Sequence, residues 1–377
     1  MRAYKILLLL FICILAMPII FFLIPSSIND VKEPMPTPTV NALGNREYQK
    51  TVDDALADRI VGHNAFVQLK TWLNLAMGQK ESNGIYIADN MLIQKPSLPS
   101  PEAVEKITKN INAFAQTTSV PKYVLIIPSS AEINQTSLPT YAPKLNELDF
   151  INDIYACLLP DIIRLDAATP LSSSKDAQVF YHTDSQLTSF GAFSIYNYNI
   201  KSMGFVPASY SDFNIEYAPC DYYGKLYQQT PYAGVKADRV DLYHYNAAKI
   251  NTTVQKYDEK KVTINNDLYY KEYLNTDEGV YVFLGEPAPL TSIKTNVENG
   301  KKLLVFGDEN IGTLSQFFSI HYAQIDIVDL SSLTPNIAGT IDINNYDEIL
   351  FATSTTALND ENMFENLSML TNKGGNT

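Results

Sequence analysis

The chain has few cysteines and no excess of basic residues, and each shortage excludes a class of protein. Three cysteines in 377 residues are too few for a disulfide-stabilised scaffold, and their spacing matches no metal site. Cys13 lies in an apolar leader, so Cys157 and Cys220 form either one disulfide or two buried thiols, and we favour thiols. The 28 Lys and Arg residues face 41 Asp and Glu residues, for a net charge of -13. This charge repels phosphate backbones, so we expect no nucleic-acid partner.

Apolar residues, by contrast, are plentiful. Hydrophobic residues make up 46% of the sequence and aromatic residues 11%. A chain of this length and composition can bury the core of one large domain or of two ordinary ones.

The N-terminus carries the longest uncharged apolar run. Ile6 to Ile24 is 19 residues long and follows Arg2 and Lys5. A helix of this length nearly matches a ~30 Å hydrocarbon core, and the positive residues favour a cytoplasmic N-terminus. The alternative is a cleavable signal peptide, whose apolar region is only ~7 to 15 residues long.

We therefore predict a single-pass membrane anchor over residues 1–25, a linker over 26–40 and an extracytoplasmic body over 41–377. The predicted location is the cell membrane, with the bulk of the chain outside.

The body alternates between helical and strand patterns. Helices are expected at Tyr48–Met77, Glu102–Thr117, Phe150–Leu159, Leu314–His321 and Asn359–Leu370, with Trp72 either in the core or packed against another helix. Strands are expected at Tyr123–Ile127, Leu303–Phe306, Ile325–Val328 and Glu348–Phe351. Short apolar strands separated by helices imply a mostly parallel sheet covered on both faces. The Tyr-rich segment at about 209–283 alternates around Val262–Tyr273 and predicts a β-rich insertion.

One predicted strand leads sharply into a helix. Leu303–Phe306 is followed by Gly307, Asp308 and Glu309 and then by a helical pattern. Such an elbow lifts one side chain over the C-terminal edge of the sheet, among backbone N–H groups and the positive helix end. A Ser there would be a nucleophile whose acyl oxyanion those N–H groups hold. Glu309 occupies the place, and helix capping alone also suits a carboxylate there.

A second block reads Thr183-Asp184-Ser185-Gln186-Leu187-Thr188 and precedes a helical pattern that runs to Met203. Together with the elbow, this block resembles the DHHW family, which is named for an Asp-His-His-Trp motif and is related to SGNH hydrolases and alginate O-acetyltransferases. Further segments that match in order are Asn83–Ile87, Leu125–Pro128, Leu138–Pro143, Asp221–Tyr227 and His321–Leu330.

The resemblance implies a three-layer α/β fold of the SGNH-hydrolase type with a flavodoxin-like parallel sheet. It also implies a Ser nucleophile in an Asp-Ser block and an Asp-x-His pair that supplies the orienting acid and the base. By position, Asp184 and Asp308 are retained, Gln186 stands in for the His, Leu187 for the Trp and Glu309 for the Ser. A Gln amide cannot accept and return a proton near neutral pH, so it cannot serve as the base.

Two hypotheses follow from this pattern, and neither requires a cofactor. In the first, the domain is catalytically impaired and binds a cell-envelope polysaccharide or scaffolds a complex, with a multi-spanning membrane O-acyltransferase as a candidate partner. In the second, it is an active O-acetyltransferase or esterase that uses Asp184 and Glu309 as an acid/base pair. The joint loss of nucleophile and base favours the first.

Three weaker alternatives stay open from the sequence. His182 is a candidate substitute base, although the elbow offers it no Ser to activate. Asp184, Asp308 and Glu309 could bind a hard cation through oxygen ligands, but we expect Asp184 and Asp308 to accept backbone hydrogen bonds, with no metal. Tyrosines of the insertion could stack on sugar rings, and half-burial is the commoner reason for such residues.

Overall fold

The computed structural model describes residues 63–371, which fall into two units. The first unit, up to Gly78, contains helix α3 (His63–Ala76). This helix confirms part of the one expected over Tyr48–Met77, but Trp72 is 63% exposed, so its predicted place in a core is wrong. Within residues 63–371, every helix is too short or too polar to cross a bilayer. The predicted anchor and linker lie outside the described residues.

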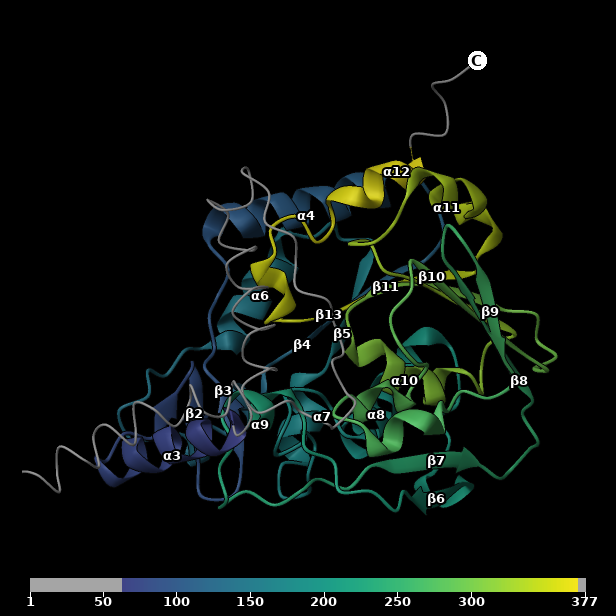
Figure 1. The fold of residues 1–377 in the computed structure, drawn as a ribbon. Helices are drawn as coiled ribbons and strands as arrows, with labels where there is room; N and C mark the ends of the chain where they lie inside the picture. The colour runs from purple at the N-terminus through teal and green to yellow at the C-terminus, as the bar shows by residue number, and fades with distance from the viewer. Residues whose placement is uncertain (1–62, 372–377) are drawn as a thin grey trace, which may run out of the picture. The chain divides into compact units, whose positions relative to one another are not determined.

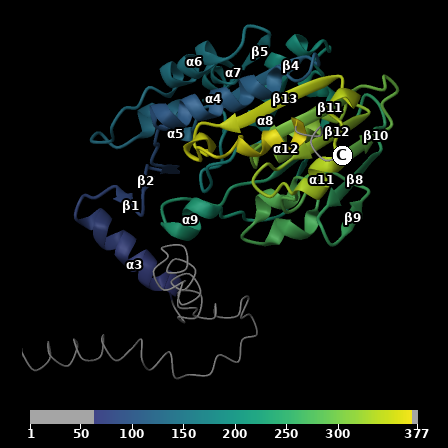
Figure 2. The same cartoon turned by 90° about the horizontal axis from the view of Figure 1, so that it is seen from above.

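A mixed eight-stranded sheet forms the centre of the second unit, Gln79–Thr377 (Figures 1 and 2), and its strand order is β5-β4-β13-β11-β12-β10-β8-β9. Its strands are β4 (Lys122–Ile127), β5 (Ile162–Asp166), β8 (Thr252–Tyr257), β9 (Val262–Asn265), β10 (Leu290–Thr295), β11 (Lys302–Gly307), β12 (Gln324–Val328) and β13 (Glu348–Ser354).

The sheet is parallel only in part. Strands β5, β4, β13, β11 and β12 run parallel, whereas β10, β8 and β9 continue the sheet in antiparallel pairs. The expected flavodoxin-like parallel sheet is therefore wrong at the β9 edge. Strands β8 and β9 are joined by a short turn over residues 258–261, which permits antiparallel pairing, whereas parallel neighbours need a long crossover.

Helices cover both faces of this sheet, as expected for a three-layer α/β domain (Figure 1). Successive side chains of a strand point to opposite faces, so Val124 and Ile126 pack on one cluster while Leu125 and Ile127 pack on the other. The first face is covered by α4 (Pro101–Ala115), α6 (Glu147–Cys157), α11 (Pro335–Thr340) and α12 (Ser368–Thr371). The second is covered by α5 (Ser130–Ile133), α7 (Ala168–Ser173), α8 (Ser189–Asn199) and α10 (Asn310–Phe318).

The remaining strands form two small sheets. One consists of β1 (Glu81–Ser82), β2 (Ile85–Ile87) and β3 (Leu92–Gln94), and the other of β6 (Phe213–Tyr217) and β7 (Asp241–Tyr245). The predicted insertion at 209–283 contains β6, β7, β8, β9 and the short helix α9 (Lys225–Gln229). It is rich in β structure as predicted, but β8 and β9 belong to the central sheet.

Two local predictions fail. The segment expected to be one helix over Asn359–Leu370 is helical only at its end, in the short pieces Glu365–Leu367 and α12, because the side chains of Asn359 and Asp360 hydrogen-bond to nearby backbone groups and compete with helix formation. Cys157 and Cys220 are free thiols, which excludes the disulfide, but Cys157 is exposed and Cys220 is only half-buried.

His321 is a half-buried histidine of the fold, at the C-terminal side of α10. The Tyr196 hydroxyl accepts a hydrogen bond from the Ala208 N–H at 2.8 Å and lies 2.7 Å from Nε2 of His321. Burial lowers the pKa of His321 to about 4.

This arrangement predicts a pH dependence of stability. The unfolded chain protonates His321 near pH 6.5 and the folded chain only near pH 4. The unfolded state thus binds more protons between these values. The contribution of His321 to the free energy of unfolding is therefore fully present above about pH 6.5 and falls as the pH drops toward 4. The His321→Gln variant, whose side-chain amide can also hydrogen-bond to Tyr196, is expected to have a free energy of unfolding that varies less with pH over this range in urea titrations. Equal slopes for the two proteins would contradict the prediction.

Candidate functional site

Asp184 is the buried centre of the Thr183–Thr188 block. Asp184 is only 1% exposed. Its Oδ2 accepts hydrogen bonds from the Tyr222 hydroxyl at 2.6 Å and from the Lys225 N–H at 2.9 Å. Oδ1 accepts from the Gln186 N–H at 3.3 Å. Burial and the charge of Asp184 raise the pKa of Tyr222 well above its usual range, so the phenol stays protonated and donates. These donors compensate for the removal of a carboxylate from water.

The Tyr222–Lys225 segment approaches Asp184 closely because residue 224 is a glycine. The Gly224 N–H donates to Thr183 Oγ1 at 2.9 Å. A Cβ atom at position 224 would lie 2.4 Å from Oδ2 of Asp184. Only a residue without a side chain fits there, and the clamp around Asp184 therefore depends on Gly224.

A second buried carboxylate, Asp238, holds the start of the same block. It accepts hydrogen bonds from the His182 N–H at 2.8 Å, the Thr183 N–H at 2.7 Å and the Thr183 hydroxyl at 2.5 Å. The backbone N–H of His182 thus helps to hold the block that contains Asp184. No sequence pattern marks Asp238, which is 54 residues away from Asp184 (238 − 184).

The predicted strand-to-helix elbow is confirmed at the junction of β11 and α10. Asp308 lies at the turn, where its carboxylate accepts from the Ser354 N–H at 2.6 Å and the Asn310 N–H at 3.0 Å. Burial raises the pKa of Asp308, although the hydrogen bonds from Ser354 and Asn310 oppose this shift. Oδ1 of Asn310 accepts from the Leu187 N–H at 3.2 Å, which ties the elbow to the block.

Glu309 stands at the position where the family resemblance places a nucleophile. It is the N-cap residue of α10, but its side chain makes no capping hydrogen bond, so capping does not account for it. Instead Oε2 accepts from Nε2 of Gln186 at 2.5 Å, and both carboxylate oxygens lie 2.9 Å from Nζ of Lys225. The residue at the expected base position is therefore hydrogen-bonded to the residue at the expected nucleophile position.

Lys225 is the charged partner that the sequence analysis missed. Desolvation lowers the pKa of Lys225, but its hydrogen bonds to Glu309 and the charge of that carboxylate raise it more strongly. The two side chains are 40% and 44% exposed, so this ion pair contributes less than about 1 kcal/mol to stability. A signal existed in the sequence, because Lys225 lies in the Asp221–Tyr227 segment that matches the family, but nothing there paired it with Glu309.

All four predicted site residues thus meet in one hydrogen-bonded network, but they form no cation site. Asp184 is occupied by neutral and backbone donors, and Glu309 by Lys225. Across residues 63–371, no group of three His, Cys, Asp or Glu side chains is arranged to hold a metal ion. The expectation that Asp184 and Asp308 accept backbone hydrogen bonds is confirmed.

The tyrosines of the insertion are mostly structural. Tyr222, Tyr243 and Tyr269 are at most 6% exposed and pack in the core. Tyr223 and Tyr227 are half-buried, with ring centroids 4.3 Å apart. Half-burial, the commoner reason for such residues, accounts for them.

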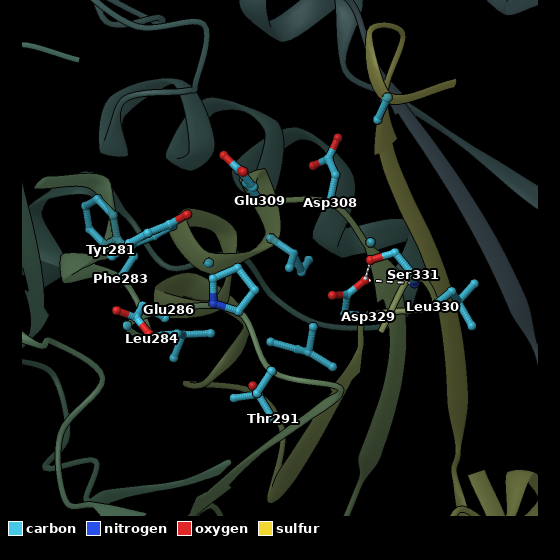
Figure 3. Close-up of a pocket in the computed structure, with 18 of the residues that line it drawn as sticks. Tyr281, Phe283, Leu284, Glu286, Thr291, Asp308, Glu309, Asp329, Leu330 and Ser331 are labelled. Carbon is cyan, nitrogen blue, oxygen red and sulfur yellow. Dashed lines mark hydrogen bonds between the residues drawn. The ribbon is translucent and has the colours of Figure 1, made fainter. Parts of the chain in front are cut away.

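Two cavities flank the elbow. One, of about 250 Å³, is lined on the β4 side by Ser129, Ser185 and Ser354, and the other, of about 470 Å³, lies on the side of Tyr281 and Asp329. Asp308 and Glu309 line both. Figure 3 shows the larger cavity with these two carboxylates at one end and Thr291 at the other.

The arrangement defines an α/β protein with a strand-to-helix elbow, in which the family resemblance assigns Glu309 to the nucleophile position and Gln186 to the base position. No model of a protein family matches the sequence, and no curated protein matches it. Solved structures do share the fold. A DHHW family protein from Eubacterium siraeum superimposes with a TM-score of 0.64 at 19% identity, over 76% of this chain and 96% of that one.

PatB1 from Bacillus cereus is similar to nearly the same extent. Its structure with a sulfonyl adduct gives a TM-score of 0.61 at 17% identity, over 74% of this chain and 97% of PatB1. A second PatB1 structure gives 0.61 at 19% identity, over 74% and 98%. The resemblance to the DHHW family inferred from the sequence is therefore confirmed in the fold.

The Gly224 contact yields a stability prediction. The Gly224→Ala variant must move Asp184 or the Tyr222–Lys225 segment, which we expect to lower the free energy of unfolding by about 1–3 kcal/mol. Gly339→Ala is a matched control, because an added Cβ there meets nothing within 4 Å. Urea unfolding of the three proteins measures the difference. A Gly224→Ala variant as stable as the Gly339→Ala control would show that Asp184 is not clamped in this way.

Proposed function

We propose that this protein is a membrane-anchored, extracytoplasmic relative of the DHHW proteins whose SGNH-like domain does not perform Ser-His chemistry. In this proposal the domain binds a cell-envelope polysaccharide or scaffolds its O-acylation, together with a multi-spanning membrane O-acyltransferase. The observation that carries the proposal is the hydrogen bond of 2.5 Å between Gln186 and Glu309.

The chemistry of these two side chains supports the loss of activity. An acyl-transfer nucleophile must attack a carbonyl carbon while a neighbouring base removes its proton. Gln186 cannot take up a proton near neutral pH. Glu309 attacking an acyl group would form a mixed anhydride, which is a poor relay for a stable acyl-enzyme.

The contacts also weigh against the alternative that Asp184 and Glu309 work as an acid/base pair. Asp184 is buried and its Oδ2 already accepts two hydrogen bonds, from Tyr222 and Lys225. Glu309 is held by the Lys225 ammonium and accepts a hydrogen bond from Gln186. Both carboxylates therefore already have partners within the protein.

A labelling experiment tests the loss of Ser-His chemistry. Fluorophosphonate and sulfonyl fluoride probes form adducts with activated nucleophiles, and we expect none with the full-length chain. The Gln186→His/Glu309→Ser double variant retains Asp184, the elbow and the helix N-terminus. We expect it to be labelled at least ~100-fold faster than any residual labelling of the unaltered chain, a factor at the lower end of general-base catalysis. Adducts are measured by intact-mass spectrometry, and thermal unfolding confirms that both proteins fold.

Two results would contradict the proposal. One is probe labelling or ester turnover by the unaltered chain that the single Glu309→Gln substitution abolishes, which would establish the acid/base alternative. The other is an unlabelled double variant that folds normally, which would show that the catalytic frame is not retained.

The binding role is tested separately. The full-length chain is expected to co-sediment with insoluble cell-envelope polysaccharide, and the Gln186→His/Glu309→Ser variant is expected to do the same, since binding does not require catalysis. Failure of both proteins to sediment would contradict the glycan part of the proposal and leave the loss of catalysis standing.

A further inference from the structure

The 470 Å³ cavity beside Glu309 has the size and position of a small-molecule site. Ligand pockets in proteins span roughly 300–1,000 Å³. This one opens where β11 and β12 end, at Gly307 and Asp329, and ligands of α/β proteins bind beyond the carboxyl ends of the strands.

The walls of the cavity are mainly apolar. Buried side chains that line it are Val280, Phe283, Leu284, Ile311, Ile327 and Phe364. Leu284 adopts a φ of 68°, a left-handed conformation that is uncommon for a residue with a side chain, and Gly285 follows with a φ of 69°. Backbone strain of this kind concentrates at ligand sites, and here it shapes the wall.

The charged groups around this apolar space are mostly acidic. Glu286, Asp329 and Asp360 line the cavity in addition to Asp308 and Glu309. Among the described residues, the carboxylate oxygens of Glu286, Asp329 and Asp360 have no Lys or Arg nitrogen within 4.0 Å. These three carboxylates alone outnumber the single lysine that lines the cavity, Lys256. The acidic excess at the cavity therefore remains when Asp308 and Glu309, which is paired with Lys225, are left out of the count.

Lys256 is engaged elsewhere in the wall. Its ammonium donates to the carbonyl oxygen of Glu286 and lies 5.1 Å from the centroid of the Tyr270 ring. Burial lowers its pKa to about 8, although the charge of Glu286 opposes this shift. The group therefore presents a weakened positive charge, already satisfied by protein atoms, to an incoming ligand.

From the apolar walls and the acidic excess, we infer that the cavity binds an amphipathic organic cation. Its apolar or aromatic body packs against Phe283, Leu284 and Ile311. Its ammonium group lies toward Glu286, which Figure 3 shows beside Leu284, with Asp329 on the opposite side of the cavity. Aromatic rings at the wall add an attraction for the cation that neutral ligands lack. This binding does not depend on the proposed role in glycan acylation.

Three probes with one apolar body and different heads test the inference: 4-phenylbutylamine, 4-phenylbutanol and 4-phenylbutanoate. Calorimetric titration of the full-length chain is expected to show binding at least tenfold tighter for the amine than for the carboxylate, with the alcohol between them. Glu286→Gln is expected to weaken amine binding about threefold without affecting the alcohol, whereas Glu361→Gln, at an exposed position outside the cavity, is expected to change neither.

A cavity-filling variant locates the binding. Ala288 lines the cavity and is half-buried, so Ala288→Phe is expected to abolish amine binding, while Ala247→Phe on an exposed turn leaves it unchanged. Tighter binding of the carboxylate probe would overturn the inference, because it would show that Lys256 and not the acidic residues determines which ligand binds. Equal affinity for the three heads, binding that survives Ala288→Phe in a folded protein, or no binding of any probe would overturn it as well.

Discussion

The site depends on the burial of Asp184. A carboxylate with almost no exposure must be surrounded by donors, and the chain supplies them from Tyr222, Lys225 and Gln186. Satisfying Asp184 brings the 222–225 segment over the Thr183–Thr188 block, and this in turn places the Lys225 ammonium against Glu309. Asp184, which the family resemblance makes the orienting acid, here positions Lys225 and Gln186. One interaction thus explains why Gln186, Lys225 and Glu309 meet beside this block.

Much of the fold could be predicted from the sequence because its signals are local. The strand at Leu303–Phe306 and the helix that follows it are marked by an apolar run, a glycine and a periodic pattern, and the elbow between them was found within a few residues. The prediction of a parallel sheet is wrong at β10, β8 and β9, where pairing between distant segments decides the strand direction. Nothing in residues 252–265 says whether a hairpin stands alone or continues a sheet, since β propensity reports a suitable surface and not a partner. The segment after Asn359 failed because its polar side chains bind the backbone locally.

The site shows the same division. Asp184, Gln186, Asp308 and Glu309 were found by the order of two short blocks, and the structure brings them together. Lys225, Asn310 and Asp238 were missed because each acts through a contact that no spacing encodes. The two cavities were also beyond the sequence, because an unfilled volume is a property of packing. The relation to DHHW and PatB1 structures is one of fold, at 17–19% identity, so the chemistry of this chain has to be judged from its own residues.

The hydrogen bond between Gln186 and Glu309 is the central feature of this site. A double-mutant cycle measures this directly, with urea unfolding of the unaltered chain, Gln186→Ala, Glu309→Ala and the double variant. Contacting residues show coupling free energies of about 0.5–3 kcal/mol, and the partly exposed Glu309 places this pair toward the lower end. We predict a favourable coupling of at least about 0.5 kcal/mol. Additive effects of the two substitutions, within error, would contradict the account.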